Sequence, residues 1–453
     1  MTPTNPHEAP VLIVGGGFSG TLLAINLQRM GARVTLIERD ANGVAHGLAF
    51  GTRRPEHLLN VRAANMSAFP DDRDHFLRWM RFDTADQANR FVPRLTYGQY
   101  LRELLHSAMA AGPDRITVVT GTAVAAETGA QGVRVTLNNG RTIAGRALVL
   151  AMGNFPPTPF APFAGLRGSI YAADPWQPGL IASIGADEDL LLLGTGLTAI
   201  DVALSLEAAG WRGRITALSR RGLLPHAHAE TGPQVQHVPC PQVRGSHLVA
   251  QVRRRAREIG WRAAVDELRP HTQNLWRRHD LAAQRRFLRH LRPWWDVHRH
   301  RLAPVVAGRI AALRAAERFT VAAGRVVAVD AAAEGARVWW RPRGEHSVQA
   351  MDVGRIINCT GPAADLAGVS DPLLRGLLTA GCIRPDAHRL GLDVDHLGRV
   401  RDAQGTARDN LFAVGPLTRG AAWEIIAVPD IRRQVWDLAR YLTNSHWVAG
   451  EGL

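Results

Sequence analysis

The apolar and polar positions along the chain repeat one pattern twice. Each repeat has a short apolar run, a glycine-rich turn, a segment whose apolar residues recur every three or four positions, and a second apolar run. The first repeat covers residues 11–37 and the second covers residues 190–218. Short apolar runs bounded by turn residues are typical of buried strands, and the three-to-four spacing is typical of a helix. Each repeat therefore predicts a strand–turn–helix–strand unit.

The first turn has the spacing Gly15-x-Gly17-x-x-Gly20, and the strand after its helix ends in Glu38. Gly15 permits the tight turn, Gly17 lets the backbone approach a pyrophosphate, and Gly20 lets the helix pack on the strand. The helix N-terminus offers amides to the phosphates. Glu38 can accept a hydrogen bond from a ribose hydroxyl. This unit predicts a dinucleotide site that suits FAD.

The second turn, Gly194-x-Gly196, has an alanine where the third glycine would stand, and its last strand ends in Ser219, Arg220 and Arg221. A carboxylate at this place would repel a 2′-phosphate, whereas arginine can bind one through paired hydrogen bonds. The unit therefore predicts an NADPH site. The alternative is that the two arginines are surface residues at a strand end. Two different dinucleotides in one chain suggest hydride transfer from NADPH to a flavin.

The order of the remaining apolar runs predicts a discontinuous domain. The runs ALVLAMGN, RIINCTGP and NLFAVGP each read as a strand that ends in a turn, and the last lies near the end of the chain. We expect an α/β fold with two Rossmann-like dinucleotide-binding domains. The NADPH domain (166–344) would be inserted between two parts of the FAD domain (1–165 and 345–453), with the flavin at their junction.

A segment at about 240–304 fits neither dinucleotide unit. It is rich in Arg, His and Trp, and its apolar residues recur at helical spacing. We interpret it as a helical insertion in the NADPH domain. It could cover the active-site cleft as a specificity element, bind polyanions, or mediate dimer formation.

Composition narrows the chemistry. The chain has 453 residues, of which 46% are hydrophobic, and no window approaches twenty uninterrupted apolar residues. Its first residues lack the basic-plus-apolar pattern of a signal peptide, so we expect a cytoplasmic protein without a membrane span. The three cysteines form no C-x-x-C pair, which argues against a disulfide framework, thioredoxin-type chemistry and a thiolate zinc site.

The basic residues are all arginine. Lys and Arg together number 54 against 40 Asp and Glu, a formal net charge of +14, and none of the 54 is a lysine. The composition thus excludes Schiff-base chemistry and the Walker-A lysine. A lysine-free chain points to coding bias as much as to phosphate binding, so we do not expect nucleic acid as a partner.

Several longer motifs resemble those of the bacterial FAD/NAD(P)-binding proteins, glutathione-reductase-like flavoproteins related to the flavin-dependent N-hydroxylating monooxygenases. The motifs include LLNVRAANMSAFPDD, FVPRLTYGQYL, LLLLGTGLTAIDVALSL, ALSRRGLLPHAH and GPLTRGAAWEIIAVPDIR. The resemblance implies FAD contacts at Gly15, Gly17, Phe18, Ser19, Gly20, Glu38, Arg39, Leu59, Asn60, Val61, Val124, Gly153, Gly361, Gly415 and Pro416. It implies NADPH contacts at Gly194, Thr195, Gly196, Leu197, Thr198, Ser219, Arg220 and Arg221.

The chain departs from related patterns at two places. Gly415-Pro416 stands where glutathione-reductase-like flavoproteins have Gly-Asp, so we expect backbone contacts to the ribityl chain there. The Baeyer–Villiger fingerprint fails because Ser169 stands where its histidine belongs. A Baeyer–Villiger oxygenase is therefore disfavoured.

The resemblance implies an FAD-dependent, NADPH-consuming monooxygenase. It would N-hydroxylate a small amine or amino acid, an acidic one included, through a peroxyflavin that must be shielded from water. Its partners would be a small-molecule substrate and O2, and a homo-oligomer is compatible with the chain. One alternative is an NADPH-dependent flavin reductase or oxidase without oxygen transfer. Another is a flavoprotein scaffold that binds polyanions through the insertion.

Three residues are candidates for catalysis. Asn60 could hydrogen-bond flavin or substrate, His228 could relay protons, and Glu424 could act as a base or bind an amine. The alternatives are a loop asparagine, a loop-capping histidine and a surface acid. Asp296, His298 and His300 are close enough in sequence to suggest a metal site, but flavin chemistry requires none, and we expect a solvated basic helix end.

Overall fold

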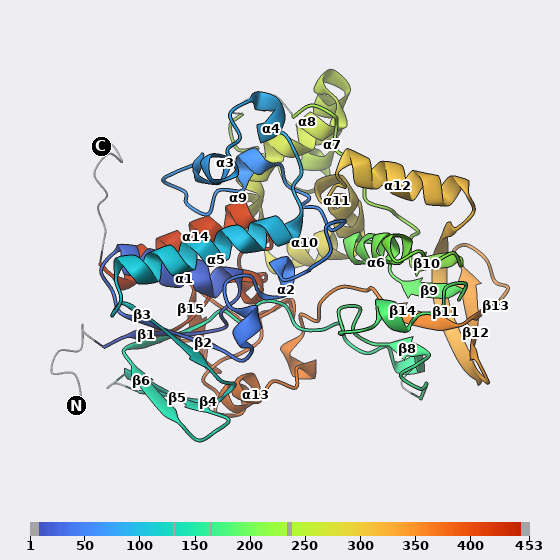
Figure 1. Ribbon diagram of the computed structural model, residues 1–453. Helices are drawn as coiled ribbons and strands as arrows, with labels where there is room; N and C mark the ends of the chain where they lie inside the picture. The colour runs from blue at the N-terminus through green and yellow to red at the C-terminus, as the bar shows by residue number, and fades with distance from the viewer. Residues whose placement is uncertain (1–8, 130–131, 164, 233–237, 445–453) are drawn as a thin grey trace.

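The computed structural model describes residues 9–129, 132–163, 165–232 and 238–444. Two large sheets lie side by side, and helices cover them (Figure 1). Both sheets have a parallel centre whose strands alternate with helices along the chain. The expected α/β class with two Rossmann-like units is therefore confirmed.

The first sheet joins strands from both ends of the chain. Its order is β15-β16-β7-β1-β2-β3, and only the β15–β16 pair is antiparallel. Because β16 pairs with β7, the chain returns to this sheet after completing the second one. The strands are β1 (Val11–Val14), β2 (Val34–Glu38), β3 (Ile116–Thr120), β7 (Ala147–Leu150), β15 (Arg399–Arg401) and β16 (Ala407–Ala413).

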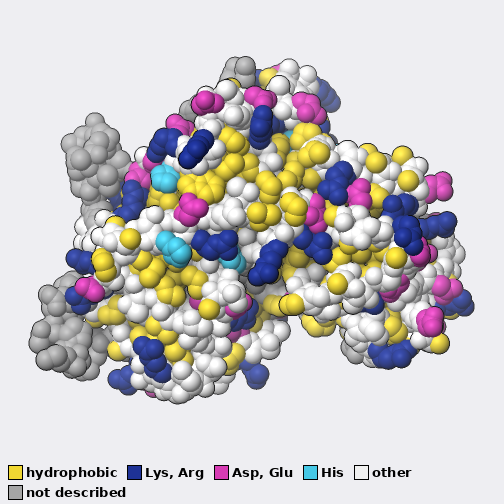
Figure 2. Space-filling view, viewed as in Figure 1, with side chains coloured by type: hydrophobic (Ala, Val, Ile, Leu, Met, Phe, Trp, Pro, Cys, Tyr) yellow, Lys and Arg dark blue, Asp and Glu magenta, His cyan; other side chains and the backbone are white. Residues whose placement is uncertain are grey.

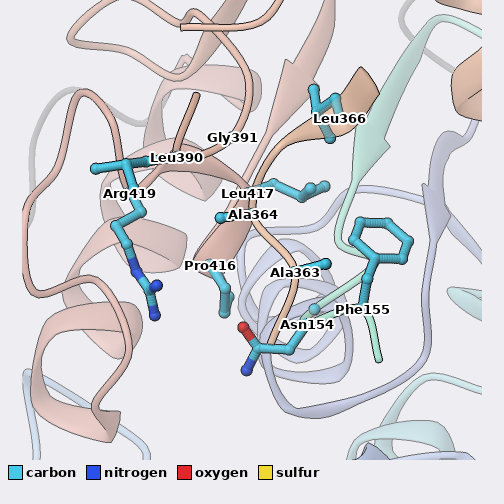
Figure 3. Close-up of a pocket in the computed structure, with 11 residues that line it drawn as sticks. Asn154, Phe155, Ala363, Ala364, Leu366, Leu390, Gly391, Pro416, Leu417 and Arg419 are labelled. Carbon is cyan, nitrogen blue, oxygen red and sulfur yellow. The ribbon is translucent and has the colours of Figure 1, made fainter. Parts of the chain in front are cut away.

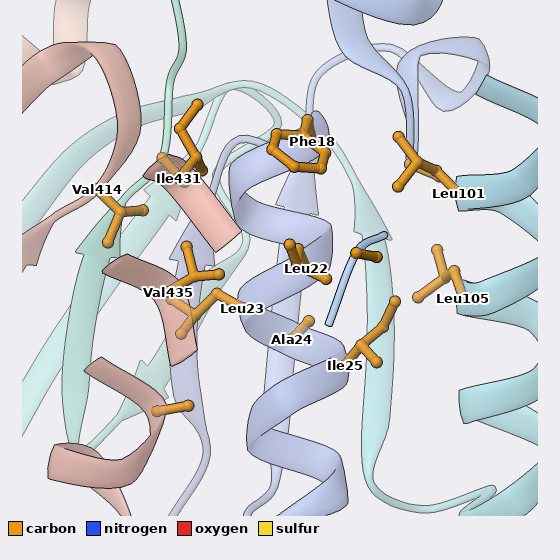
Figure 4. Packing of buried hydrophobic residues seen from close by; sticks show 14 of the residues in the cluster. Phe18, Leu22, Leu23, Ala24, Ile25, Leu101, Leu105, Val414, Ile431 and Val435 are labelled. Carbon is orange, nitrogen blue, oxygen red and sulfur yellow. The ribbon is translucent and has the colours of Figure 1, made fainter. Parts of the chain in front are cut away.

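Three helices cover one face of the first sheet: α1 (Phe18–Arg29), α5 (Arg94–Ala111) and α14 (Val428–Leu442). Figure 4 shows the apolar side chains of α1 between those of the other two helices. Leu22 and Leu23 of α1 are completely buried. Burying a leucine contributes about 1.5–3 kcal/mol, so this layer fixes the helix whose N-terminus carries the first glycine turn.

The other face packs on a small antiparallel sheet, β4-β5-β6, and on α13. Residues of β1 alternate between the two faces: Val11 and Ile13 face α1, whereas Leu12 and Val14 face the small sheet. This is the period-two pattern of a strand buried on both sides. The elements are β4 (Ala123–Gly129), β5 (Gly132–Leu137), β6 (Thr142–Gly145) and α13 (Pro372–Thr379).

The second sheet has the order β13-β12-β11-β10-β9-β14-β8. Its β11–β10–β9–β14–β8 portion is parallel, and β12 and β13 continue it as an antiparallel edge. Helices α6 (Leu197–Ala208) and α12 (Pro304–Ala315) pack on one face. The strands are β8 (Tyr171–Ala172), β9 (Leu190–Leu193), β10 (Ile215–Ser219), β11 (Phe319–Ala332), β12 (Gly335–Pro342), β13 (Gln349–Val353) and β14 (Arg355–Asn358).

The expected helical insertion lies between β10 and α12. Figure 1 shows it at the top of the view, between the helices of the two sheets. Its helices are α7 (Gly245–Ile259), α8 (Trp261–Leu268), α9 (Thr272–Arg277), α10 (Leu281–Arg286) and α11 (Arg292–Arg299), with a π-helical stretch at Phe287–Leu291. The remaining short helices are α2 (Gly47–Phe50), α3 (His75–Met80) and α4 (Ala85–Ala88).

Most predicted element bounds agree with the structure, with two differences. The helical spacing of the apolar residues in this part of the sequence predicts a helix over 98–110, whereas α5 begins at Arg94, directly after Pro93, because a proline cannot stand in the helix interior. The second sheet continues to Asn358, beyond the expected domain boundary at residue 344, because β14 pairs with β9 and β8. No helix among the described residues is long and apolar enough to cross a membrane.

Candidate functional site

The first glycine turn connects β1 to α1, and glycine is required there for packing. Gly15 has φ +105°, and a Cβ on it would lie 2.4 Å from the carbonyl oxygen of Ala151. A Cβ on Gly20 would lie 1.9 Å from the Gly15 carbonyl oxygen. These contacts let α1 begin directly at the carboxyl edge of the sheet, so that its free N-terminal amides face the place where a dinucleotide binds.

Glu38 closes this turn. Its Oε2 accepts a 2.6 Å hydrogen bond from the Gly16 amide, and its Oε1 accepts one of 3.2 Å from the Asp40 amide. The carboxylate is thus held at the end of β2 beside the turn, while its remaining lone pairs can accept from a ribose hydroxyl. Arg39 follows it and is exposed. The turn residues and Glu38 fit the adenosine half of FAD.

The other residues expected near FAD surround the same edge. Gly153 follows β7 with φ +68°, and Gly415 follows β16 with φ +70°. Gly153 lines a pocket, and Gly415 directly precedes Pro416, which lines the same pocket (Figure 3). Leu59 is buried and Val61 packs against the first core, whereas Val124 lies half-buried on β4.

The amide of Gly415, where we expect a backbone contact to a ribityl chain, has a partner inside the protein. This amide donates a 2.7 Å hydrogen bond to Oε1 of Gln434 on α14, and Pro416 has no amide hydrogen. Gln434 also donates to the Thr418 hydroxyl, 2.9 Å away. The glutamine therefore fixes the 415–418 turn from inside the protein. The sequence pattern did not reveal it, because Gln434 lies on a helix with no motif of its own.

The second turn joins β9 to α6. Gly194 has φ +115°, and a Cβ on it would lie 2.4 Å from the Cys359 carbonyl oxygen at the end of β14. A Cβ on Gly196 would meet nothing within 4 Å, so the space beside it is open for a ligand. Leu197 and Thr198 begin α6 directly after it. This arrangement fits a second dinucleotide.

The hydroxyl groups near the second turn are already used. Thr195 hydrogen-bonds to the Leu223 carbonyl oxygen at 2.6 Å and to the Ser219 hydroxyl at 3.0 Å, and Ser219 also accepts from the Gly222 amide at 3.0 Å. These bonds shape the loop after β10. Ser219 thus helps to shape this loop as a hydrogen-bond acceptor, and its role in binding a phosphate stays a prediction.

Arg220 and Arg221 directly follow β10, whose neighbour β9 leads into the second turn. Arg220 is exposed and Arg221 is half-buried. Among the residues that the structure describes, neither guanidinium has a hydrogen bond or an ion pair with another side chain. Two arginines without protein partners at this edge can bind an anion with both forks.

Two of the three catalytic candidates lie together. The His228 ring donates from Nε2 to the Asn60 carbonyl oxygen at 3.1 Å, if that nitrogen carries the proton. Burial, together with the charge of Arg301, lowers the pKa of His228 to about 3. The ring is therefore neutral at working pH. The Phe91 ring lies 4.9 Å from it, between centroids.

Glu424 is buried rather than at the surface, and neighbouring groups already compensate its negative charge. Its carboxylate lies 3.5 Å from Nε of Arg299 and 3.4 Å from Nε2 of His300, and it accepts a 2.9 Å hydrogen bond from Trp295. Although burial opposes ionisation, these partners lower its pKa to about 2. A carboxylate with so low a pKa is a weak base at neutral pH. A role as general base is thus disfavoured.

Asp296, His300 and Glu424 offer ligand atoms that lie within 4.8 Å of one another. The expected solvated helix end is wrong, because Asp296 and His300 are half-buried against Glu424. However, the guanidinium of Arg299 already contacts Glu424, and a cation at that place opposes a metal ion. We interpret the group as a charge cluster that fastens α11 to the 415–426 segment.

Aromatic residues fasten the insertion at a second place. Trp276 stacks on Trp423 with ring centroids 5.1 Å apart and donates to the Gly420 carbonyl oxygen at 2.8 Å. Phe287 packs edge-on against Trp423 at 5.5 Å. The insertion therefore covers the segment that follows Gly415. Of the three roles considered for the insertion, this contact favours the one in which the insertion covers the active-site cleft.

The visible face of the molecule gives little support to a polyanion groove. Figure 2 shows arginine side chains dispersed among acidic and apolar ones on that face rather than gathered into a single stripe. Recognition of a nucleic acid backbone requires such a concentration of positive charge.

Sequence reasoning missed the contact between α6 and two residues of the first part of the chain, His57 and Arg94. Arg94 pairs with Asp201 of α6 through both carboxylate oxygens, at 2.8 and 3.1 Å. The buried His57 ring bonds to the Ser205 hydroxyl of the same helix at 2.8 Å. An acid in the otherwise apolar run LTAIDVALSL was the available signal, because a buried carboxylate requires a partner.

Comparison with known proteins agrees with this geometry. Residues 12–155 match the model of a family described as FAD-NAD(P)-binding. This part of the chain is therefore similar to FAD/NAD(P)-binding domains. The matched residues include the first turn and Glu38 and end beside Gly153. The expected FAD/NAD(P) cofactor class is thus confirmed. No curated protein matches the sequence significantly.

Solved structures share the fold of this domain and of the rest of the chain. L-lysine 6-monooxygenase from Pseudomonas syringae has a TM-score of 0.67 and 17% identity, covering 97% of this chain and 100% of that one. An ornithine N-hydroxylase from Kutzneria sp. 744, with reduced FAD, NADP+ and L-ornithine, has a TM-score of 0.63 and 15% identity, covering 96% and 99%. Bacillithiol disulfide reductase from Bacillus cereus has a TM-score of 0.56 and 14% identity, covering 97% and 99%. The expected resemblance in fold is confirmed.

Proposed function

We propose that the protein is an FAD- and NADPH-dependent monooxygenase that hydroxylates the nitrogen of a small amine or amino acid, acidic ones included. The observation that carries this proposal is the pair of dinucleotide turns with opposite charge at their second strands. Glu38 suits a ribose hydroxyl, whereas Arg220 and Arg221 have no partner among the described side chains and suit a 2′-phosphate. The neighbours named for lysine and ornithine hydroxylation share this fold over nearly the whole chain.

FAD, when bound, would accept hydride from NADPH and, once reduced, would react with O2 taken from solution. The chain itself would provide binding and shielding. The first turn and Glu38 would hold the adenosine half of FAD, and the second turn with the two arginines would orient NADPH. The insertion, fastened by Trp276 and Arg299, would exclude water from the segment after Gly415. His228, which is neutral and bonded to the Asn60 carbonyl oxygen, would hold the loop around Asn60 in place.

The test starts from the purified flavoprotein. NADPH is added without oxygen and the flavin absorbance is followed, and we expect reduction that is faster with NADPH than with NADH. Oxygen and a panel of amines and amino acids, basic and acidic, are then supplied, and hydroxylamine and hydrogen peroxide are both measured. Hydroxylamine in proportion to NADPH consumed is the expected result.

Two other results would contradict the proposal in different ways. Hydrogen peroxide in proportion to NADPH, with no hydroxylated product from any compound, would favour the oxidase alternative. Reduction of an added disulfide or quinone without oxygen would favour a reductase. The bacillithiol disulfide reductase, which shares the fold of this chain, shows that the fold is compatible with that activity. An absence of flavin reduction by either nicotinamide would refute the pairing of the two turns.

A further inference from the structure

A small pocket lies at the carboxyl edge of the first sheet, beside the residues assigned to FAD. Gly153, Asn154, Pro416 and Leu417 line it, as do residues after β14. Most of its lining is apolar or glycine, and Arg419 is the one charged residue among the described residues that line it. Figure 3 shows the Arg419 guanidinium and the Asn154 amide directed to the same side, with Pro416 between them. The pocket therefore presents one positive charge and one amide.

Arg419 is placed there by the backbone. It follows the short 3-10 turn Gly415–Thr418, and its amide donates to the Pro416 carbonyl oxygen at 3.2 Å. That turn is itself fixed by Gln434, whose side chain bonds to both Gly415 and Thr418. The base of the arginine is thus rigid, which is the condition for a preorganised binding group.

The guanidinium of Arg419 has no hydrogen bond or ion pair with any residue that the structure describes. Burial and the nearby Arg292 lower its pKa, while Glu424 and Asp296 act in the opposite direction. Both of those carboxylates are already engaged: Glu424 with Arg299 and His300, and Asp296 with Arg292 at 3.4 Å. Nothing nearby therefore neutralises Arg419 completely.

Partial burial removes some of the hydration of the Arg419 guanidinium, and no hydrogen bond from a described residue replaces it. Two other arginines enclosed by this protein do have partners. Arg301 pairs with Asp266, and Arg62 donates to the carbonyl oxygens of Asn89 and Ala229. Arg419 differs from these because it lines a pocket. An anionic ligand group would supply the missing hydrogen bonds, and a planar oxyanion matches its fork.

We propose that Arg419 binds an oxyanion of the ligand held at this edge, either the diphosphate of the flavin nucleotide or the carboxylate of a substrate. The second source rests on the proposed function, whereas the first requires only that the domain binds FAD. Both sources present the same chemistry to the guanidinium. Asn154 would donate its side-chain amide to the same group.

The experiment compares wild type with Arg419→Gln, Arg419→Lys and the control Arg375→Gln, an exposed arginine of α13. Each flavin-loaded protein is diluted, and the release of FAD is followed by its fluorescence. Each is also titrated with propionate and with propionamide, while the flavin absorbance is recorded. Neither measurement requires turnover, so a failure of the monooxygenase proposal leaves both readable.

If the diphosphate is the source, FAD release from Arg419→Gln accelerates tenfold or more. If a carboxylate is the source, FAD stays bound and the preference for propionate over propionamide falls at least tenfold. In both cases Arg419→Lys lies between Gln and wild type, because it keeps the charge and loses the fork, and it carries the test if the Gln variant fails to fold. Unchanged FAD release together with an unchanged or absent propionate preference would overturn the proposal.

Discussion

Substitution of Glu424 by glutamine tests the charge cluster that fastens the insertion. The side chain keeps its shape and loses its charge, so that Arg299, only 7% exposed, loses its carboxylate. Removing one partner of a buried pair costs about 3–5 kcal/mol. The lowered pKa gives an independent figure. The pKa of Glu424 falls from an ordinary 4.5 to about 2 in the folded protein, and this difference corresponds to about 3 kcal/mol of unfolding free energy. The two figures agree.

The dependence on pH has a definite sign. Because the folded-state pKa of Glu424 is depressed, its contribution is complete above about pH 5 and is lost as the pH falls from 4.5 toward 2. The difference in unfolding free energy between wild type and Glu424→Gln should therefore be about 3 kcal/mol at pH 7. It should shrink by about 1 kcal/mol at pH 4.

The assay is a urea titration followed by tryptophan fluorescence at both pH values. Trp276 and Trp295 lie beside the cluster, so detachment of the insertion will change the signal. Asp409→Asn is the control, because Asp409 is 86% exposed in its pair with Arg399 and such pairs contribute about 0–1 kcal/mol. A difference below about 1 kcal/mol for Glu424→Gln at pH 7, or one that grows on acidification, would refute the reasoning.

Two further predictions concern the nucleotide turns. The double variant Arg220→Ala, Arg221→Ala should raise the KM for NADPH about tenfold or more and leave that for NADH unchanged, because only NADPH carries the 2′-phosphate. Steady-state kinetics with both nucleotides check this, and equal changes for the two would contradict it. Gly20→Ala should prevent FAD loading, measured by flavin absorbance, because its Cβ would lie 1.9 Å from the Gly15 carbonyl oxygen. Gly196→Ala should fold and retain FAD, since its Cβ meets no protein atom within 4 Å. It should weaken NADPH binding, because the Cβ would occupy the open space assigned to that ligand. Equal flavin loss in both glycine variants would be inconsistent with two separate sites.

The turns could be predicted from sequence because their cause is local. A four-residue apolar strand, a glycine with positive φ and a helix directly after it determine one another within about ten residues. The strands at residues 11–14 and 190–193 begin where the two repeats were predicted to begin for this reason. Glu38 and Arg220 were found in the same way, since each follows the next strand of its unit.

The contacts between units could not be predicted from local patterns. His228 and Asn60 are 168 residues apart, and Arg94 and Asp201 are 107 apart. The sequence offered Glu424 as a candidate, but its low pKa comes from partners at residues 295–300 that only tertiary packing brings to it. The use of the Gly415 amide was missed for the same reason, because Gln434 lies nearly two helix turns inside α14.

The position of β16 has a consequence for biosynthesis. This strand pairs with β7, yet Leu411 follows its partner Leu148 only after the whole second sheet and the insertion have been translated. Until then the growing chain exposes the open edge of β7, and unpaired edges invite association with other chains. Release of a chain cut short before residue 407 should therefore yield aggregation rather than a separate FAD-binding fragment, whereas complete translation lets β16 cover that edge.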